Sequence, residues 1–117
     1  MTDPQLIYKI ATEASYAPAR GTPSYAGMPI DAKDGYLHLS TSTQLPETLR
    51  LHFAGQSGLV ILAVRTADLR DKLVWEPSRG GQLFPHFYGA LPLSAVAWEA
   101  PLSVAADGAC MLPEAVQ

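Results

Sequence analysis

Residues 59–64, Leu59-Val60-Ile61-Leu62-Ala63-Val64, form an almost unbroken apolar run near the middle of the chain. An apolar run of this length indicates a β-strand that is covered on both faces, rather than a strand with one solvated side. We therefore expect a central strand here, and we expect the hydrophobic core to form around it.

Short elements of both kinds surround this strand. Alternating apolar, β-branched and aromatic residues predict further strands over residues 6–10, 36–41, 72–76 and around 95–98. Apolar residues at helical spacing predict a helix over residues 43–54, with Pro46 inside its first turn, and a shorter helix is predicted over residues 12–19. These elements define an α+β fold with one or two helices.

No repeat, low-complexity block or long polar linker divides the chain of 117 residues. We therefore expect a single domain over residues 1–117, with a core of about residues 6–102 and a tail over residues 103–117. The segment 21–35 has no clear pattern and is predicted to be a loop. Loops of this length either cover a ligand or are mobile.

The composition disfavours several classes of function. The formal net charge is −3 and the 8 Lys and Arg residues are scattered, so we expect no basic surface for nucleic acid. No run approaches the roughly 18 apolar residues of a membrane span, so we expect no membrane role. The single cysteine, Cys110, allows no internal disulfide and no secretion signal is recognisable, which together favour a cytoplasmic protein.

The predicted strand Tyr36-Leu37-His38-Leu39-Ser40-Thr41 is the most informative short segment. Alternation places Leu37 and Leu39 on one face and Tyr36, His38 and Ser40 on the other. If this second face borders a cavity, its imidazole and hydroxyl can bind a sugar hydroxyl or an amide, and its tyrosine can stack on a ring. The alternative is an ordinary solvated strand face.

Residues 80–98 contain no charged side chain, but they include Phe84, His86 and Tyr88 among glycines and prolines. These rings either fill the core or line a cleft. Arg79 and Gly80 precede them, and a glycine-rich turn beside an arginine can hold an anion such as a phosphate. A plain turn with a solvated arginine is the alternative.

Three further side chains bear on the chemistry. Glu76 and Glu99 each follow a tryptophan at the end of a predicted strand, where partial burial would raise the pKa of the carboxyl group. Both are candidate catalytic carboxylates, and solvated strand ends are the alternative. His52 lies on the inner face of the predicted helix and is expected to be a hydrogen-bonded core histidine. No His or Cys pair has metal-ligand spacing, so we expect no metal site.

Four blocks of sequence, taken in order, resemble a known family. They are residues 7–10 (Ile-Tyr-Lys-Ile), 34–41, 52–56 and 75–89. They are similar to domain-of-unknown-function family 952, a group of small bacterial and plant proteins without an established activity. The resemblance implies a fold similar to that of the ADP-ribosyltransferases, in which short strands form two packed sheets and NAD is held in the cleft between them.

The resemblance also implies roles for individual residues. His38 would bind the adenosine ribose of NAD, and Ser40 would support the nicotinamide end. Tyr36, Phe84 or Tyr88 would stack on the nicotinamide ring.

That superfamily further uses a late glutamate, often as Glu-x-Glu, to stabilise the cationic sugar while the glycosidic bond breaks. This chain has no Glu-x-Glu, so the motif assigns the role to neither of the candidates Glu76 and Glu99, and ADP-ribosyl transfer is not assured.

The sequence therefore predicts a cleft that binds a nucleotide-like or sugar-phosphate ligand, with NAD as the candidate cofactor. The residues assigned to ligand binding are Tyr36, His38, Ser40, Arg79, Gly80, Phe84, His86 and Tyr88. The alternative is a non-enzymatic binding or homo-oligomerisation module, in which the uncharged stretch 80–98 is the interface.

Overall fold

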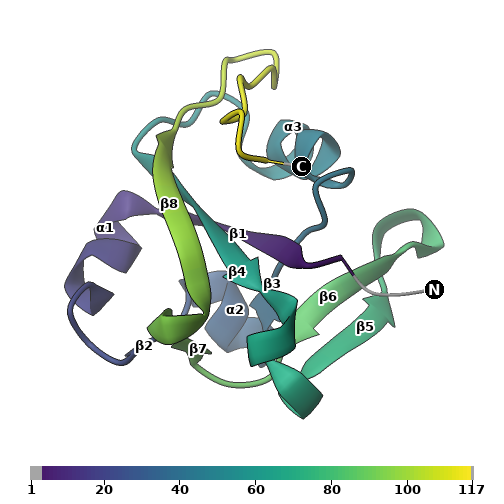
Figure 1. Ribbon diagram of the computed structural model, residues 1–117. Helices are drawn as coiled ribbons and strands as arrows, with labels where there is room; N and C mark the ends of the chain where they lie inside the picture. The colour runs from purple at the N-terminus through teal and green to yellow at the C-terminus, as the bar shows by residue number, and fades with distance from the viewer. Residues whose placement is uncertain (1–3, 117) are drawn as a thin grey trace.

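The predicted central strand is confirmed. A computed structural model describes residues 4–116, apart from the side chain of Arg79. In it β4 (Leu59–Arg65) lies between β1 (Leu6–Thr12) and β8 (Val96–Leu102) in an antiparallel sheet, which we call the core sheet (Figure 1). The side chains of residues 60, 62 and 64 belong to one buried cluster, and those of residues 59, 61 and 63 belong to another. The run is apolar throughout because both of its faces are covered.

A second antiparallel sheet, which we call the site sheet, has the strand order β3-β6-β5. Its strands are β3 (Leu37–His38), β6 (Leu83–Phe87) and β5 (Leu73–Pro77). Just after β3 the chain crosses to the core sheet, where the N–H groups of Tyr8 and Ser40 each donate to the other residue's carbonyl, at 2.8 and 2.9 Å. The two sheets are therefore held edge to edge at this point.

A third, two-stranded sheet pairs β2 (Ser24–Tyr25) with β7 (Leu91–Pro92). Residues 4–116 thus form three antiparallel sheets, where the resemblance implied two. The additional pair is two residues long in each strand, which is too short to leave a periodic signal in the sequence.

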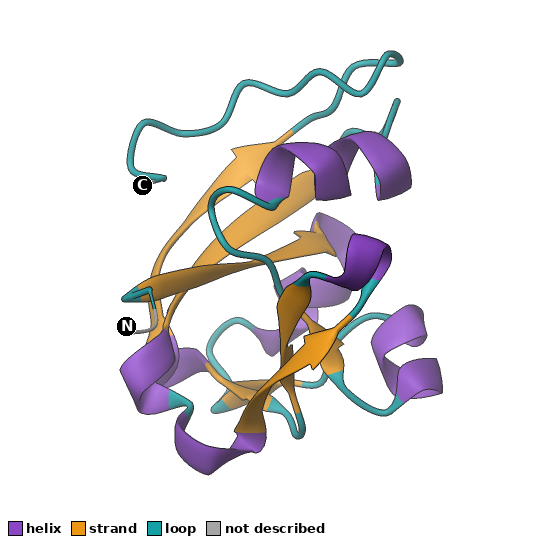
Figure 2. Ribbon diagram, turned by 90° about the vertical axis from the view of Figure 1, so that its right-hand side faces the viewer, coloured by secondary structure: helices purple, strands orange, loops and turns teal. Residues whose placement is uncertain are grey.

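The described residues also form three α-helices rather than one or two. They are α1 (Glu13–Tyr16), α2 (Pro29–Asp34) and α3 (Leu45–His52). α3 lies within the predicted segment 43–54 and covers one face of the core sheet through Leu45 and Leu49 (Figure 2). α1 is shorter than predicted and continues as a 3₁₀ turn over Ala17–Ala19, because Pro18 removes a backbone donor.

The helix α2 lies in the segment that was predicted to be a loop. It starts with Pro29, whose missing N–H costs nothing at the first helical position. The Asp31 carboxylate accepts a hydrogen bond from the N–H of Met28 at 2.7 Å, and Gly35 ends the helix with a φ of 86°. Capping groups, not an apolar stripe, specify this helix, so hydrophobic periodicity does not reveal it.

Residues after β8 return along α3 and the core sheet (Figure 1). Val104 is buried and its N–H donates to the carbonyl of Gln56 at 2.8 Å, while Gly55 donates to Ala105 at 2.9 Å. Leu112 packs against the cluster that contains Leu49. The segment expected to be a tail therefore covers part of the core as far as residue 116.

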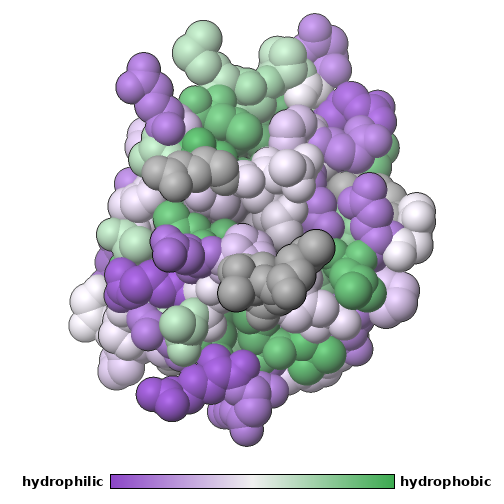
Figure 3. Space-filling model, turned by 45° about the vertical axis from the view of Figure 1, so that its right-hand side comes forward, coloured by the Kyte–Doolittle hydropathy of each residue, from purple (hydrophilic) through white to green (hydrophobic). Residues whose placement is uncertain are grey.

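The surface mixes polar and apolar residues (Figure 3). The exposed large apolar side chains are Ile30, Leu51, Val74, Leu83, Tyr88 and Met111. Among residues 4–116, no helix has the length and apolar character needed to cross a membrane.

Candidate functional site

The register of the site sheet brings the predicted site residues to one face. His38 lies opposite His86, and Glu76 lies opposite Phe84. Because side chains two residues apart on a strand share a face, Tyr36, His38 and Ser40 are on the same side as Phe84 and His86. Leu37 and Leu39 are both 2% exposed on the other side. The predicted alternation is confirmed for residues 36–40, although the strand is shorter than the predicted 36–41 and comprises only Leu37–His38.

This face borders a cavity of about 550 Å³. The volume lies in the range of small-molecule sites in proteins. Of the predicted ligand-binding residues, Tyr36, His38, Ser40, Phe84 and His86 line the cavity. Its polar lining also includes Thr48, His52, Gln56 and Ser78, which sequence reasoning did not assign to ligand binding. Thr48 and His52 arrive on α3, one turn apart.

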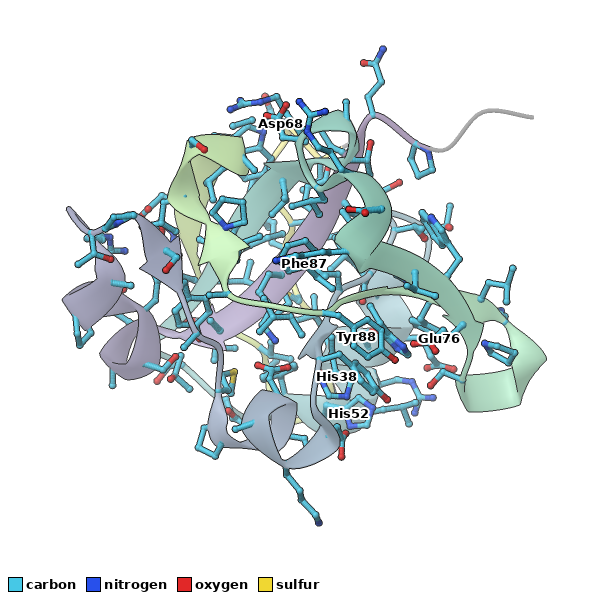
Figure 4. The ribbon with its side chains drawn as sticks, turned by 90° about the horizontal axis from the view of Figure 1, so that it is seen from below. His38, His52, Asp68, Glu76, Phe87 and Tyr88 are labelled. Atoms are coloured by element: carbon cyan, nitrogen blue, oxygen red, sulfur yellow. The ribbon has the colours of Figure 1, made fainter. Side chains whose placement is uncertain are left out.

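Tyr36 is the centre of a cluster of rings. Its ring is stacked on His86, with centroids 4.1 Å apart, and it also contacts His38 at 4.8 Å and Tyr88 at 5.3 Å. Figure 4 shows Glu76 beside Tyr88, which agrees with the hydrogen bond between them. Burial raises the pKa of Tyr36, and the negative charges of Asp34 and Glu76 raise it further, so its hydroxyl stays protonated. The neutral hydroxyl can donate a hydrogen bond and can also accept one.

His38 has carboxylates at both ring nitrogens. Nδ1 lies 2.7 Å from Asp31 Oδ1, and Nε2 lies 2.9 Å from Asp34 Oδ2. A neutral imidazole can donate from only one nitrogen, so only the doubly protonated ring satisfies both acids. A ligand in the cavity can therefore contact the ring of His38, but neither ring nitrogen is free to form a hydrogen bond with it.

Asp31 also forms a buried ion pair with Lys9. Lys9 Nζ lies 2.9 and 2.8 Å from the two carboxylate oxygens and 3.2 Å from the carbonyl oxygen of His38. The side chains of Lys9 and Asp31 are 3% and 1% exposed. With the N–H of Met28 and the N–H of His38 also donating to it, the Asp31 carboxylate joins β1, α2 and β3 behind the cavity wall.

The ionisation of Asp31 makes the stability of the fold depend on pH. Burial by itself raises the pKa of this carboxyl, but the hydrogen bond from His38 and the Lys9 ammonium outweigh burial and hold the pKa well below its ordinary value. Because the pKa is lower in the folded chain than in the unfolded chain, the stabilisation is complete above the unfolded pKa of about 3.9. It is lost as the pH falls through the folded pKa.

We therefore expect the free energy of unfolding to fall as the pH decreases from about 5. Asp31→Asn should flatten this dependence, because the titrating group is gone, whereas the exposed Asp71→Asn should leave it unchanged. Urea unfolding at a series of pH values measures the slopes. Equal slopes for the wild type and Asp31→Asn would contradict the assignment.

Glu76 accepts hydrogen bonds from two site residues. Its Oε1 lies 2.8 Å from His86 Nδ1 and 2.7 Å from the Tyr88 hydroxyl. The hydrogen bonds from Tyr88 and His86 outweigh burial and lower the pKa of Glu76, so the prediction of a raised pKa is wrong. The hydrogen bond between Tyr88 and Glu76 raises the pKa of Tyr88 to about 12. Glu76 is therefore an ionised acceptor held beside the cavity.

Other predicted residues lie elsewhere. Glu99 accepts hydrogen bonds from Arg20, at 3.0 Å to Nε, and is not part of the cavity lining. Gly80 lies in a turn with a φ of 68° and does not line the cavity, although Ser78 beside this turn does. The predicted role of Arg79 falls on a side chain outside the described residues. His52 is exposed at the end of α3, so the prediction of a core histidine is wrong.

Fold and site together define a small α+β domain of antiparallel sheets with a cavity on the face of one sheet. The chain belongs to the family described as protein of unknown function (DUF952), whose model matches residues 10–99.

The chain is also similar to protein CC0527 from Caulobacter crescentus. The crystal structure of CC0527 is 43% identical, with 91% of this chain and 93% of that chain covered and a TM-score of 0.84. Its solution structure is 44% identical over 90% of each chain, with a TM-score of 0.77. A comparison with curated proteins gave no match.

Proposed function

We propose that the cavity binds a small nucleotide-like ligand, with NAD as the candidate. The observation that carries the proposal is that one face of the site sheet presents Tyr36, His38, Ser40, Phe84 and His86 to a single cavity of about 550 Å³. Aromatic rings next to hydroxyl and amide groups suit a ligand that combines a planar base with a ribose.

The polar lining supports the ribose part of this proposal. Ser40 Oγ lies 3.2 Å from Thr48 Oγ1, and a hydroxyl group can take part in more than one hydrogen bond. Gln56 and Ser78 add an amide and a second hydroxyl to the cavity wall. Ribose hydroxyls both donate and accept, so they match such a mixed lining.

A fold similar to that of the ADP-ribosyltransferases belongs to this proposal, as does a phosphate held by Arg79 and the neighbouring glycine amides. Of the two candidate carboxylates, only Glu76 has direct contacts with cavity-side rings, whereas Glu99 is paired with Arg20. ADP-ribosyl transfer is not part of the proposal, because a similar fold does not by itself establish that reaction.

Thermal unfolding in the presence of NAD, ADP-ribose and adenosine tests the proposal. A ligand at about 100 times its dissociation constant stabilises the native state by about 2.7 kcal/mol, which raises the Tm of a domain of this size by several degrees. We expect at least one of the three probes to raise the Tm. Ser40→Ala should reduce the shift, because it removes a hydroxyl from the cavity.

The exposed Ser94, which lies outside the cavity, gives a matched control. Ser94→Ala should keep the full shift. If no probe raises the Tm of the wild type, the nucleotide proposal fails. If the protein then also elutes as an oligomer, the alternative of a non-enzymatic oligomerisation module is favoured.

A further inference from the structure

The structure distinguishes the three histidines that line the cavity. Both ring nitrogens of His38 are hydrogen-bonded to carboxylates, and His52 is exposed at the end of α3. His86 differs from both, because the residue is 4% exposed, its ring is stacked on Tyr36 and its Nδ1 is hydrogen-bonded to Glu76. Among the described residues, none forms a hydrogen bond with its other nitrogen, Nε2.

The contact with Glu76 defines the tautomer of His86. A carboxylate oxygen can only accept, so Nδ1 must carry the proton of the 2.8 Å hydrogen bond. In the neutral ring, Nε2 then has a free lone pair. Tyr88 donates to the same carboxylate oxygen at 2.7 Å, which holds Glu76 in place. This is the arrangement in which a carboxylate orients a histidine that acts as a base.

We propose that His86 is a general base, with Glu76 as its positioning residue, and that the cavity hydrolyses its ligand. The inference rests on the proposed function, because it takes the bound nucleotide-like molecule as the substrate. The oxygen of a water molecule forms a bond to an electrophilic atom of the ligand, and the water proton passes to His86 Nε2. The bond to the leaving group breaks, the leaving group keeps the electron pair, and the proton on Nε2 returns to it or to solvent.

Nitrogen NMR of the histidine side chains tests the tautomer in the unmodified protein. We expect neutral His86 to carry its proton on Nδ1. Glu76→Gln should shift the proton toward Nε2, because an amide can also donate to Nδ1. A loss of packing alone would not move this signal. A wild-type ring with its proton on Nε2 would overturn the proposal.

The hydrolysis of p-nitrophenyl acetate tests the base without relying on a nucleotide. We expect His86→Asn to lower the protein-catalysed rate by about 100-fold, the lower end of general-base effects. Glu76→Gln should lower the rate as well, and the exposed Glu114→Gln, which lies outside the cavity, should leave it unchanged. A wild-type rate that survives His86→Asn would refute the role of His86.

These measurements separate the two proposals. Suppose that no nucleotide raises the Tm, but that the ester rate depends on His86 and Glu76 and the tautomer is as expected. The role of His86 as a base is then supported, and the proposal of a nucleotide-like ligand is wrong. Suppose instead that NAD, ADP-ribose or adenosine binds but remains intact on long incubation, and that the ester rate does not depend on His86. The proposed binding site is then supported, and the proposed hydrolytic activity is wrong.

Discussion

Asp31→Ala is expected to lower the free energy of unfolding by about 3–5 kcal/mol, the cost of leaving a buried charge without its partner. Lys9 is 2% exposed, and both of its contacts to carboxylate oxygens are with Asp31. The substitution also removes the acceptor for the N–H groups of Met28 and His38. Urea unfolding monitored by fluorescence measures the loss.

The double variant Lys9→Met with Asp31→Ala is the control. It removes the buried ammonium as well, so no unpaired charge remains, and we expect it to be more stable than Asp31→Ala alone. The assignment is wrong if Asp31→Ala costs less than about 1 kcal/mol, since a buried unpaired charge costs more than that. It is also wrong if the double variant is no more stable than the single one.

Leu49→Ala should cost about 2–5 kcal/mol, because it opens a cavity between α3 and the core sheet. Leu49 is 0% exposed and packs in the cluster that includes Ile61 and Leu45. The same helix carries Thr48 and His52 to the cavity, so the substitution should also weaken ligand binding. Denaturant unfolding gives the stability, and the Tm shift with NAD gives the binding.

Leu51→Ala is the matched control on the same helix. Leu51 is 46% exposed, so its truncation should change the free energy of unfolding by no more than about 0.5 kcal/mol. Comparable losses for the two variants would show that α3 is not anchored through Leu49.

Much of the fold follows from local patterns. The apolar run 59–64 predicted the central strand, because a strand buried on two faces admits few polar residues. The alternation over 6–10 predicted the strand that the structure places beside it. The helical spacing of Leu45 and Leu49 predicted α3 in the same way. α2 escaped detection because its ends are specified by Pro29 and by Asp31, not by an apolar stripe.

The candidate site was predictable only in part. Alternation placed Tyr36, His38 and Ser40 on one face, and the structure confirms that face. Strand pairing decides which of the two candidate glutamates, Glu76 or Glu99, lies near this face. Glu76 is on β5, next to β6 in the site sheet, whereas Glu99 is on β8 in the core sheet.

The sequence by itself determined which faces of the strands are apolar, because alternation is a property of neighbours along the chain. Only the tertiary structure decided what the three histidines can do. His38 and Asp31 are 7 residues apart, Glu76 and His86 are 10 apart, and Lys9 and Asp31 are 22 apart. The protonation and reactivity of these groups depend on charges and hydrogen bonds that come together only when the sheets pair, so no local pattern contains them.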